Sequence, residues 1–392
     1  MKPPPPVRHA ARARQQAVER RDLAAAQRLT TEILAQGWVV SDTTDGYSLQ
    51  PRTPLEPAGR SLADYTTLRL GGPARRLVRA ETEAELVDVV READASGEPV
   101  LVLGAGSNLV VSDDGFAGVV VQVATRGVTR DGDHHAVAAG EGWDGFVLDV
   151  LSAGRVGVEA LSGIPGLVGA TPIQNVGAYG QDVAQTVTAV RVLDRTSGRV
   201  RALTPDECRF GYRHSAFKGS QRYVVLGVTF DLPVAPAGRP LRYAGLASHL
   251  GLRVGDLAPA PAVREAVLDL RRSKGMVLDP ADHDTWSAGS FFTNPVLDAA
   301  DAARLPPDAP RWPEPDGRVK TSAAWLIEQA GFAPGYGEGP VRLSTKHTLA
   351  LTNRGDASTE QLLALARTLR EGVRERFGVT LDHEPVLVGV SL

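Results

Sequence analysis

The chain has 392 residues, of which 43% are apolar, and its 43 lysine and arginine residues nearly balance 46 aspartate and glutamate residues. This composition excludes a disordered or fibrous protein and is large enough for two or three hydrophobic cores. A net charge of −3 argues against a general polyanion binder, and the single cysteine, Cys208, excludes an internal disulfide and a cysteine-rich zinc site.

Membrane insertion is not indicated. No window approaches the roughly 18 consecutive apolar residues that a membrane span needs. The amino terminus reads MKPPPPVRHAARAR and lacks the apolar core of a signal peptide. We therefore expect a cytoplasmic protein that binds neither a membrane nor nucleic acid.

Residues 1–50 differ from the rest of the chain. A proline run at 3–6 is followed by a basic stretch with arginines at positions 12, 14, 20, 21 and 28. We predict an exposed helical or mobile extension. A solvated appendage, or a translation start placed too early, explains this stretch better than a nucleic-acid arm.

Strands and helices follow from about residue 65. A strand is predicted over 74–80, and the capping box Thr82 to Glu85 opens a helix that Gly97 ends. Short apolar strands are predicted over 100–103, 109–111, 119–123, 189–193 and 223–231, with a hairpin turn at 195–198.

A Pro/Gly/Ala linker at 233–240 precedes the remaining part of the chain. This part is predicted to hold a helix around 261–274, an apolar segment near 323–330, a long helix opened by the capping box at 358–361, and a strand over 386–390. The mixture of hairpins and crossovers indicates an α+β protein.

Two glycine-rich segments are candidates for ligand binding. Gly104-Ala105-Gly106-Ser107-Asn108 lies between two predicted strands, where its N–H groups are suited to converge on an anion, although a plain tight turn explains it equally well. Residues 163–180 combine many glycines with two amides, a composition unsuited to helix or strand. We expect that segment to wrap a flat or polar ligand with backbone.

Three further segments carry reactive groups. Residues 210–218 place Arg213 and Lys218 among aromatics, which suits an anion site and the covering of a core about equally. Ser290 stands between a glycine and two phenylalanines, a water-poor setting that suits a proton donor, with a structural turn about as probable. Glu384 precedes the closing strand, a position typical of a surface carboxylate.

Taken together, these segments resemble a known family. Tyr65 to Gly72, Gly104 to Asn108, Gly163 to Gly180, Tyr212 to Lys218, Gly289 to Pro295 and Glu384 occur in the order found in the UDP-N-acetylenolpyruvoylglucosamine reductases. The segment Leu241 to Leu246 resembles the subgroup whose tyrosine loop covers the substrate. The resemblance runs from about residue 60 to the carboxyl end and leaves residues 1–50 uncovered.

The resemblance implies a fold and a domain order. The fold is a vanillyl-alcohol-oxidase-type FAD-binding module of two α+β subdomains plus a third α+β domain that binds a UDP-sugar. We expect an extension over 1–50, subdomain 1 over 51–125 with the strand 380–392 returning to it, subdomain 2 over 126–235 and the substrate domain over 236–379.

The resemblance also implies residue roles. The catalytic positions are Arg213, Ser290 and Glu384. The cofactor-binding positions are Gly104, Ala105, Gly106, Ser107, Asn108, Gly163, Ile164, Gly169, Ala170, Thr171, Gln174, Asn175, Gly177, Ala178 and Tyr179. The substrate-binding positions are Tyr243, Lys274, Asn294, Trp312 and His347, and no metal is expected. The chain departs from the family's usual lysine, tyrosine and amide at Thr293, Trp312 and His347, which affects the expected UDP contacts.

The implied reaction uses noncovalent FAD and NADPH to reduce UDP-N-acetylglucosamine enolpyruvate to UDP-N-acetylmuramate for peptidoglycan, in a protein expected to be a monomer. Negative charge develops toward the substrate carboxylate, which Arg213 would stabilise. Glu384 would hold the guanidinium or, if protonated, donate to the enolate. Ser290 would protonate the second carbon.

Two alternatives remain at this point. One is a flavin oxidase or dehydrogenase of the same fold; many of these attach flavin through a histidine, which residues 104–108 lack. The other is a flavin or UDP-sugar binding protein without turnover, against which the retained Arg213, Ser290 and Glu384 count.

Overall fold

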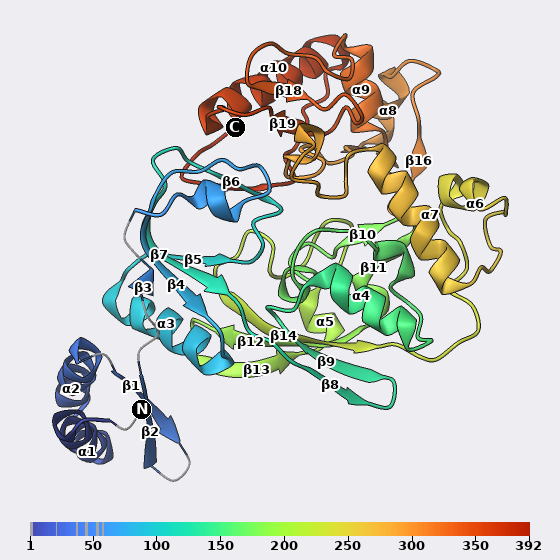
Figure 1. Cartoon of the computed structure of the whole chain (residues 1–392). Coiled ribbons are helices and arrows are strands. Elements are labelled where there is room, and N and C mark those ends of the chain that lie inside the picture. Colours follow the sequence, from blue (N-terminus) through green and yellow to red (C-terminus); the bar gives the residue numbers. More distant parts are fainter. Residues whose placement is uncertain (1–2, 21, 37, 44–45, 52–54, 57–58) are drawn as a thin grey trace.

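The computed structural model describes residues 3–20, 22–36, 38–43, 46–51, 55–56 and 59–392. It is an α+β structure, as the sequence predicts, with helices on the outside of small sheets (Figure 1). Within these residues, no helix combines the length and the apolarity needed to cross a membrane. No cluster of three or more His, Cys, Asp or Glu side chains there could hold a metal ion.

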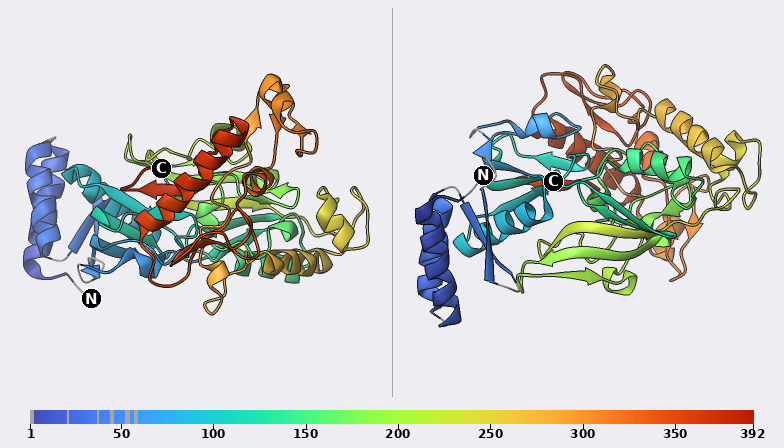
Figure 2. Two further views of the ribbon diagram at one scale, coloured as in Figure 1. Left: turned by 90° about the horizontal axis from the view of Figure 1, so that it is seen from above. Right: turned by 60° about the horizontal axis from the view of Figure 1, so that its bottom comes forward.

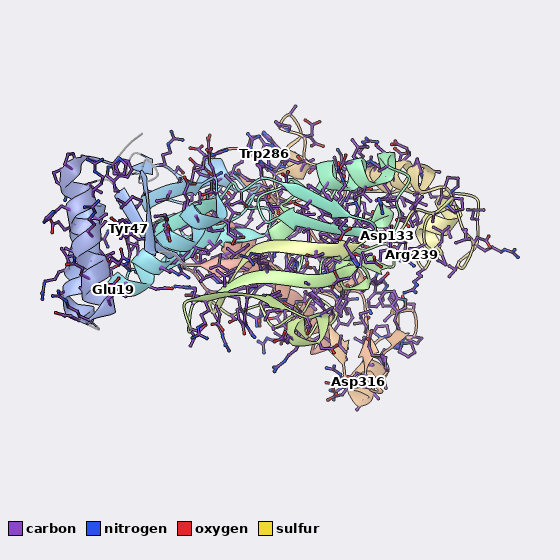
Figure 3. The ribbon with its side chains drawn as sticks, turned by 90° about the horizontal axis from the view of Figure 1, so that it is seen from below. Glu19, Tyr47, Asp133, Arg239, Trp286 and Asp316 are labelled. Carbon is purple, nitrogen blue, oxygen red and sulfur yellow. The ribbon has the colours of Figure 1, made fainter. Side chains whose placement is uncertain are left out.

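The amino-terminal residues form a small lobe at one end of the molecule (Figures 1 and 2). Figure 3 labels Glu19 and Tyr47 in this lobe, far from Asp316 on a projecting loop. The expected helices are α1 (Pro5–Glu19) and α2 (Leu23–Ala35), but the antiparallel pair β1 (Trp38–Thr43) and β2 (Gly46–Pro51) was not anticipated. The pair forms because its apolar side chains share a core with the helices, made of Val7, Ala10, Ala11, Ile33, Trp38 and Val40.

A first sheet follows, in the order β3 (Leu55–Glu56), β4 (Ala74–Ala80), β7 (Phe116–Val123) and β5 (Val100–Leu103). Strand β7 begins three residues before the predicted strand. The predicted capping box forms with both reciprocal bonds at the start of α3 (Glu83–Ser96), which ends at Gly97. Strand β6 (Leu109–Val111) pairs in parallel with β20 (Val386–Val388), so the carboxyl-terminal segment returns to this part of the molecule.

The second sheet is antiparallel and has five strands. Their order is β13 (Arg199–Leu203), β12 (Val187–Asp194), β14 (Tyr223–Asp231), β9 (His134–Ala138) and β8 (Val128–Asp131). Helix α4 (Trp143–Ser152) packs Trp143 and Phe146 against Phe230 of β14. Leu193, Val224 and Leu226 of this sheet share a core with α3 and β7, which joins the two sheets.

Short elements between residues 159 and 208 support the loops of the second sheet. The 3₁₀ turns are Glu159–Leu161, Val168–Ala170 and Val183–Gln185, with a fourth, Leu62–Tyr65, before β4. The other elements are β10 (Gly177–Ala178), β11 (Gln181–Asp182) and α5 (Pro205–Cys208).

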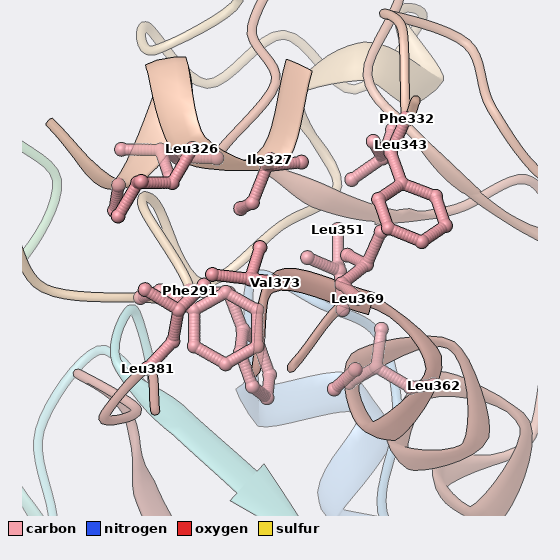
Figure 4. Packing of buried hydrophobic residues seen from close by; sticks show 14 of the residues in the cluster. Phe291, Leu326, Ile327, Phe332, Leu343, Leu351, Leu362, Leu369, Val373 and Leu381 are labelled. Carbon is pink, nitrogen blue, oxygen red and sulfur yellow. The ribbon is translucent and has the colours of Figure 1, made fainter. Parts of the chain in front are cut away.

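The remaining part of the chain packs around α10 (Thr359–Phe377), whose predicted capping box also forms (Figure 4). Its other helices are α6 (Ala244–His249), α7 (Ala260–Ser273), α8 (Ala299–Arg304) and α9 (Ala323–Gln329), with a 3₁₀ turn at His283–Thr285. Its strands are β15 (Val296–Leu297), β16 (Trp312–Pro313), β17 (Val319–Lys320), β18 (Val341–Leu343) and β19 (Leu351–Asn353). The domain boundaries at residues 50, 125, 235 and 379 stay a prediction.

Candidate active site

One cavity of about 920 Å³ collects residues from all the parts of the chain after residue 60. The three positions expected to be catalytic, Arg213, Ser290 and Glu384, all line it. So do most positions expected to bind a cofactor or substrate, which are Gly104, Ala105, Gly106, Ser107, Asn108, Ile164, Gly169, Ala170, Thr171, Gln174, Gly177, Ala178, Tyr179, Tyr243, Lys274 and His347.

Four of the expected site residues do not line this cavity. Gly163 and Asn175 lie in the segment that forms its wall. Asn294 accepts a hydrogen bond on Oδ1 from the N–H of Ala323 at 3.0 Å, so it caps α9. Trp312 is 44% exposed on β16. The structure therefore does not bring Asn294 and Trp312 together with the other positions.

The loop 104–108 follows β5 and has the form of an anion-binding turn. Gly106 has φ +59°, and a Cβ there would lie 1.9 Å from the carbonyl oxygen of Tyr65, so only glycine fits. The N–H groups of Ala105, Gly106 and Ser107 donate to no protein acceptor within residues 59–392. Free N–H groups in a tight glycine turn provide a binding place for a phosphate.

The long glycine-rich segment is fixed by an ion pair that the sequence analysis missed. Asp144 Oδ1 accepts from the Gly163 N–H at 2.5 Å, and both its oxygens accept from Arg264 of α7 at 2.6 and 2.8 Å. Burial would raise the pKa of Asp144, but the hydrogen bonds from Arg264 and Gly163 hold it below its ordinary value. The carboxylate thus ties this wall of the cavity to α7.

Tyrosines close another side of the cavity. Tyr179 has φ +50°, and its ring meets that of Tyr243 edge to face with 5.5 Å between centroids. The Tyr243 side chain is 44% exposed. An aromatic pair with one exposed member is suited to cover a bound ligand.

A partly buried ion pair forms one corner of the cavity. Glu384 Oε1 lies 3.0 Å from Arg213 Nε and accepts from Gln174 Nε2 at 3.0 Å. The Glu384 side chain is only 14% exposed, so the surface carboxylate suggested by its sequence position is wrong. Burial raises the pKa of Glu384, while Arg213, Lys218 and Gln174 oppose that rise.

A second corner of the cavity holds Ser290 and His347. Ser290 Oγ lies 3.4 Å from His347 Nε2, and the Phe291 N–H donates to the Leu349 carbonyl at 2.7 Å, which joins the two loops. Burial, with Lys274 and Arg271 nearby, lowers the pKa of His347 to about 4. The imidazole is therefore neutral at pH 7.

Arg271 is a cavity residue that the sequence analysis did not name. It lies one helical turn before Lys274, and its Nε is buried without a hydrogen-bond partner in the described structure, while Nη2 donates to the Met276 carbonyl at 2.7 Å. Burial lowers the pKa of Arg271. The sequence signal that points to Arg271 is its spacing: it stands three residues before Lys274, and both continue the apolar face of α7.

These features fit a flavin dinucleotide. The cavity volume lies within the range of small-molecule and cofactor sites. Unpartnered N–H groups at 104–108 suit a pyrophosphate. The buried, unpartnered Arg271 Nε offers a donor to a further acceptor.

Comparison with known proteins agrees with this geometry. Residues 279–388 match the family model of the UDP-N-acetylenolpyruvoylglucosamine reductase C-terminal domain, and residues 74–204 match an FAD binding domain. A UDP-N-acetylenolpyruvoylglucosamine reductase of Thermobifida fusca is 58% identical over 84% of this chain and 97% of its own length. That of Streptomyces coelicolor is 56% identical over 88% of this chain and 94% of its own length.

One solved structure of a named reductase is also similar to this chain. The crystal structure of UDP-N-acetylenolpyruvylglucosamine reductase from Thermus caldophilus aligns with 86% of this chain and 99% of its own, with a TM-score of 0.60 and 28% identity. The α+β FAD-binding fold with an added carboxyl-terminal domain is therefore confirmed.

Proposed function

The chain belongs to the UDP-N-acetylenolpyruvoylglucosamine reductase family, and from this membership we propose how its cavity residues divide the reaction. The activity is the FAD-dependent reduction of the enolpyruvyl ether of UDP-N-acetylglucosamine enolpyruvate to UDP-N-acetylmuramate in peptidoglycan synthesis. NADPH is the proposed reductant. We place the reaction in the cytoplasm and assign it to a monomer.

The cofactor would be held by the two glycine-rich segments. Residues 104–108 would bind the pyrophosphate of noncovalent FAD through backbone N–H groups. Residues 163–179 would flank its ring system, with Asn175 shaping the wall through a hydrogen bond from Nδ2 to the Gly211 carbonyl at 3.1 Å. When bound, FAD supplies a hydride relay from NADPH to the terminal vinyl carbon of the substrate.

Arg213 stabilises the charge that this reduction creates. Negative charge moves toward the substrate carboxylate, and a guanidinium that cannot lose its proton stabilises it more in the transition state than in the ground state. Glu384 holds the guanidinium at Nε from one side, at 3.0 Å. The Arg213 donors other than Nε are left for the substrate.

Ser290 donates the proton that completes the reduction. Its hydroxyl lines the same cavity as Arg213, and Gly289 before it has φ +72° with open space where a Cβ would stand. The O–H proton passes to the second carbon, and the hydroxyl is restored from water. The neutral His347 beside it leaves Ser290 protonated between turnovers.

The UDP-sugar would be bound by Lys274 and His347, with Tyr243 as a stacking surface covering it. Asn294 and Trp312 are proposed as outer contacts because neither lines the cavity. The exposed Trp312 ring would reach a nucleotide only if the substrate extends past the cavity mouth.

The observation that carries this proposal is the meeting of Arg213, Glu384 and Ser290 in the cavity that also contains the 104–108 loop. The test is NADPH oxidation by FAD-loaded protein, with and without UDP-N-acetylglucosamine enolpyruvate. We expect turnover only with the enolpyruvyl substrate, and release of the flavin by mild acid. Oxygen-driven turnover of an alcohol, or binding of the nucleotide sugar with no NADPH oxidation, would contradict the proposal.

A further inference from the structure

The backbone at Arg213 is held in an unfavourable conformation. Arg213 has φ +50°, in the left-handed region that costs a residue with a side chain roughly 1 kcal/mol or more. It stands in a tight turn in which Gly211 and His214 exchange backbone hydrogen bonds of 3.0 and 3.2 Å. Such a conformation persists only where neighbouring groups hold it in place.

Lys218 supplies one of these holding contacts. Its ammonium group donates to the Arg213 carbonyl oxygen at 3.0 Å. The Asn175 side chain holds the other end of the turn, at the Gly211 carbonyl. Lys218 is partly buried and is absent from the cavity lining, so it contacts Arg213 without lining the cavity itself.

The same ammonium acts on Glu384. Burial raises the pKa of Glu384, and Lys218 is the second cation, after Arg213, that opposes this rise. A carboxylate in such a place keeps its charge only while nearby cations offset its loss of hydration. The hydrogen bond from Gln174 supports the ionised form as well.

We propose that Lys218 is a positioning residue that holds Arg213 in its left-handed backbone conformation and, by its charge, keeps Glu384 ionised beside the guanidinium. This inference rests on the proposed reductase reaction, in which Arg213 binds the substrate carboxylate. Lys218 contacts neither substrate nor cofactor and acts through these two residues.

Three substitutions separate the two effects. Lys218→Met removes both the hydrogen bond and the charge, Lys218→Gln keeps a donor without charge, and Lys218→Arg keeps the charge. We expect kcat to fall about 10²-fold in the Met variant, as for a small misplacement of a catalytic group, with KM for NADPH unchanged. The fall in kcat should be smaller in the Gln variant and smallest in the Arg variant.

The pH profile distinguishes this role from a purely structural one. The acid limb of the kcat–pH profile reports the ionisation of Glu384. In the Met and Gln variants this limb should move to higher pH, because the cation that lowers the pKa of Glu384 has been removed. In the Arg variant that limb should stay in place. Infrared spectra, taken as differences from the Glu384→Gln variant, detect the protonated carboxyl group of Glu384 directly. This measurement does not require the enzyme to turn over.

Lys320→Met is the matched control. Its ammonium lies 4.8 Å from the ring centroid of Tyr212 in the same turn and pairs with Glu314, but it makes no contact with Arg213. We expect its pH profile to match wild type. The inference would be overturned if Lys218→Met kept the kcat and the acid limb of wild type. It would also be overturned if Lys320→Met lost as much kcat as Lys218→Met. A wild-type protein without turnover would instead contradict the proposed function, while the infrared test would still stand.

Discussion

Burial acts with opposite sign at the two corners of the cavity. At the Arg213 corner it raises the pKa of Glu384, and two cations and an amide oppose it. At the Ser290 corner it lowers the pKa of His347 to about 4, and the cations Lys274 and Arg271 reinforce it. Loss of hydration disfavours charge in both cases, so an acid and a base shift in opposite directions.

The two corners therefore differ in charge: one cavity has a charged pair at one corner and neutral groups at the other. The Arg213 corner holds an ion pair and, in the proposed reaction, receives the developing negative charge. The Ser290 corner places an uncharged imidazole beside an uncharged hydroxyl, which suits the proposed role of Ser290 as a proton donor to a strong base.

The largest effect is expected from Ser290→Ala. Flavin reduction by NADPH needs no proton from this hydroxyl and should stay near normal. Reoxidation by the enolpyruvyl substrate should slow by roughly 10²-fold to 10⁴-fold, as for loss of a positioned general acid. Stopped-flow absorbance of the flavin follows each half-reaction, and unchanged reoxidation would move the proton donor to another group.

Glu384→Gln tests the ion pair at the other corner. The amide keeps the shape of the side chain but removes the negative partner of Arg213. We expect kcat to fall about 10²-fold, with flavin content preserved, because the guanidinium loses its fixed orientation. Steady-state kinetics measure this, and Glu314→Gln is the control, since Glu314 pairs with Lys320 away from the cavity. Equal kcat in wild type and Glu384→Gln would show that the charge at this corner is dispensable.

Lys274→Ala should act on binding rather than on chemistry. A charge-assisted contact to phosphate contributes about 1.5–3 kcal/mol, so KM for the nucleotide sugar should rise roughly 10-fold to 100-fold. Flavin reduction by NADPH should be nearly unchanged. Arg272→Ala is the matched control, because Arg272 is exposed and pairs with Asp269. Parallel losses in both half-reactions of Lys274→Ala would indicate a folding defect.

The smallest effect concerns the neutral state of His347. Its folded pKa of about 4 lies below the unfolded value near 6.5, so between these values the unfolded chain binds more protons and stability falls as pH falls. From pH 7 to 5 this residue should cost about 1–2 kcal/mol.

His347→Gln isolates this contribution, because the amide does not titrate. The free energy of unfolding is measured with urea at pH 7 and at pH 5. It should fall less between these pH values in the variant than in wild type. Identical losses in the two proteins would mean that folding does not lower the pKa of His347, and the contrast between the two corners would fail.

Local sequence signals predicted local structure well. The capping boxes at Thr82 and Ser358 form with both reciprocal hydrogen bonds, and the helix at 83–96 ends on a left-handed Gly97, because these interactions depend only on residues a few positions apart. The strand pair at 38–51 was missed, since its stability comes from packing on the preceding helices.

The candidate site was predicted mainly from the ordered set of motifs. Spacing alone does not reveal that Glu384 lies partly buried beside Arg213, because the two residues are far apart in the sequence and meet only in the folded chain. Asp144 and Arg271 belong to no motif, and their roles follow from contacts with Gly163 and with the cavity. Only three-dimensional packing determines such partners.

The parallel pairing of β20 with β6 has a consequence for synthesis on the ribosome. Strand β6 is synthesised long before Val386 to Val388, with which it pairs. Amino-terminal parts of a protein start to fold first during translation. The nascent FAD-binding part must therefore wait with an open β6 edge, and no partly translated chain carries the Arg213–Glu384 pair. We therefore expect reductase activity only from chains in which Glu384 and β20 have been synthesised.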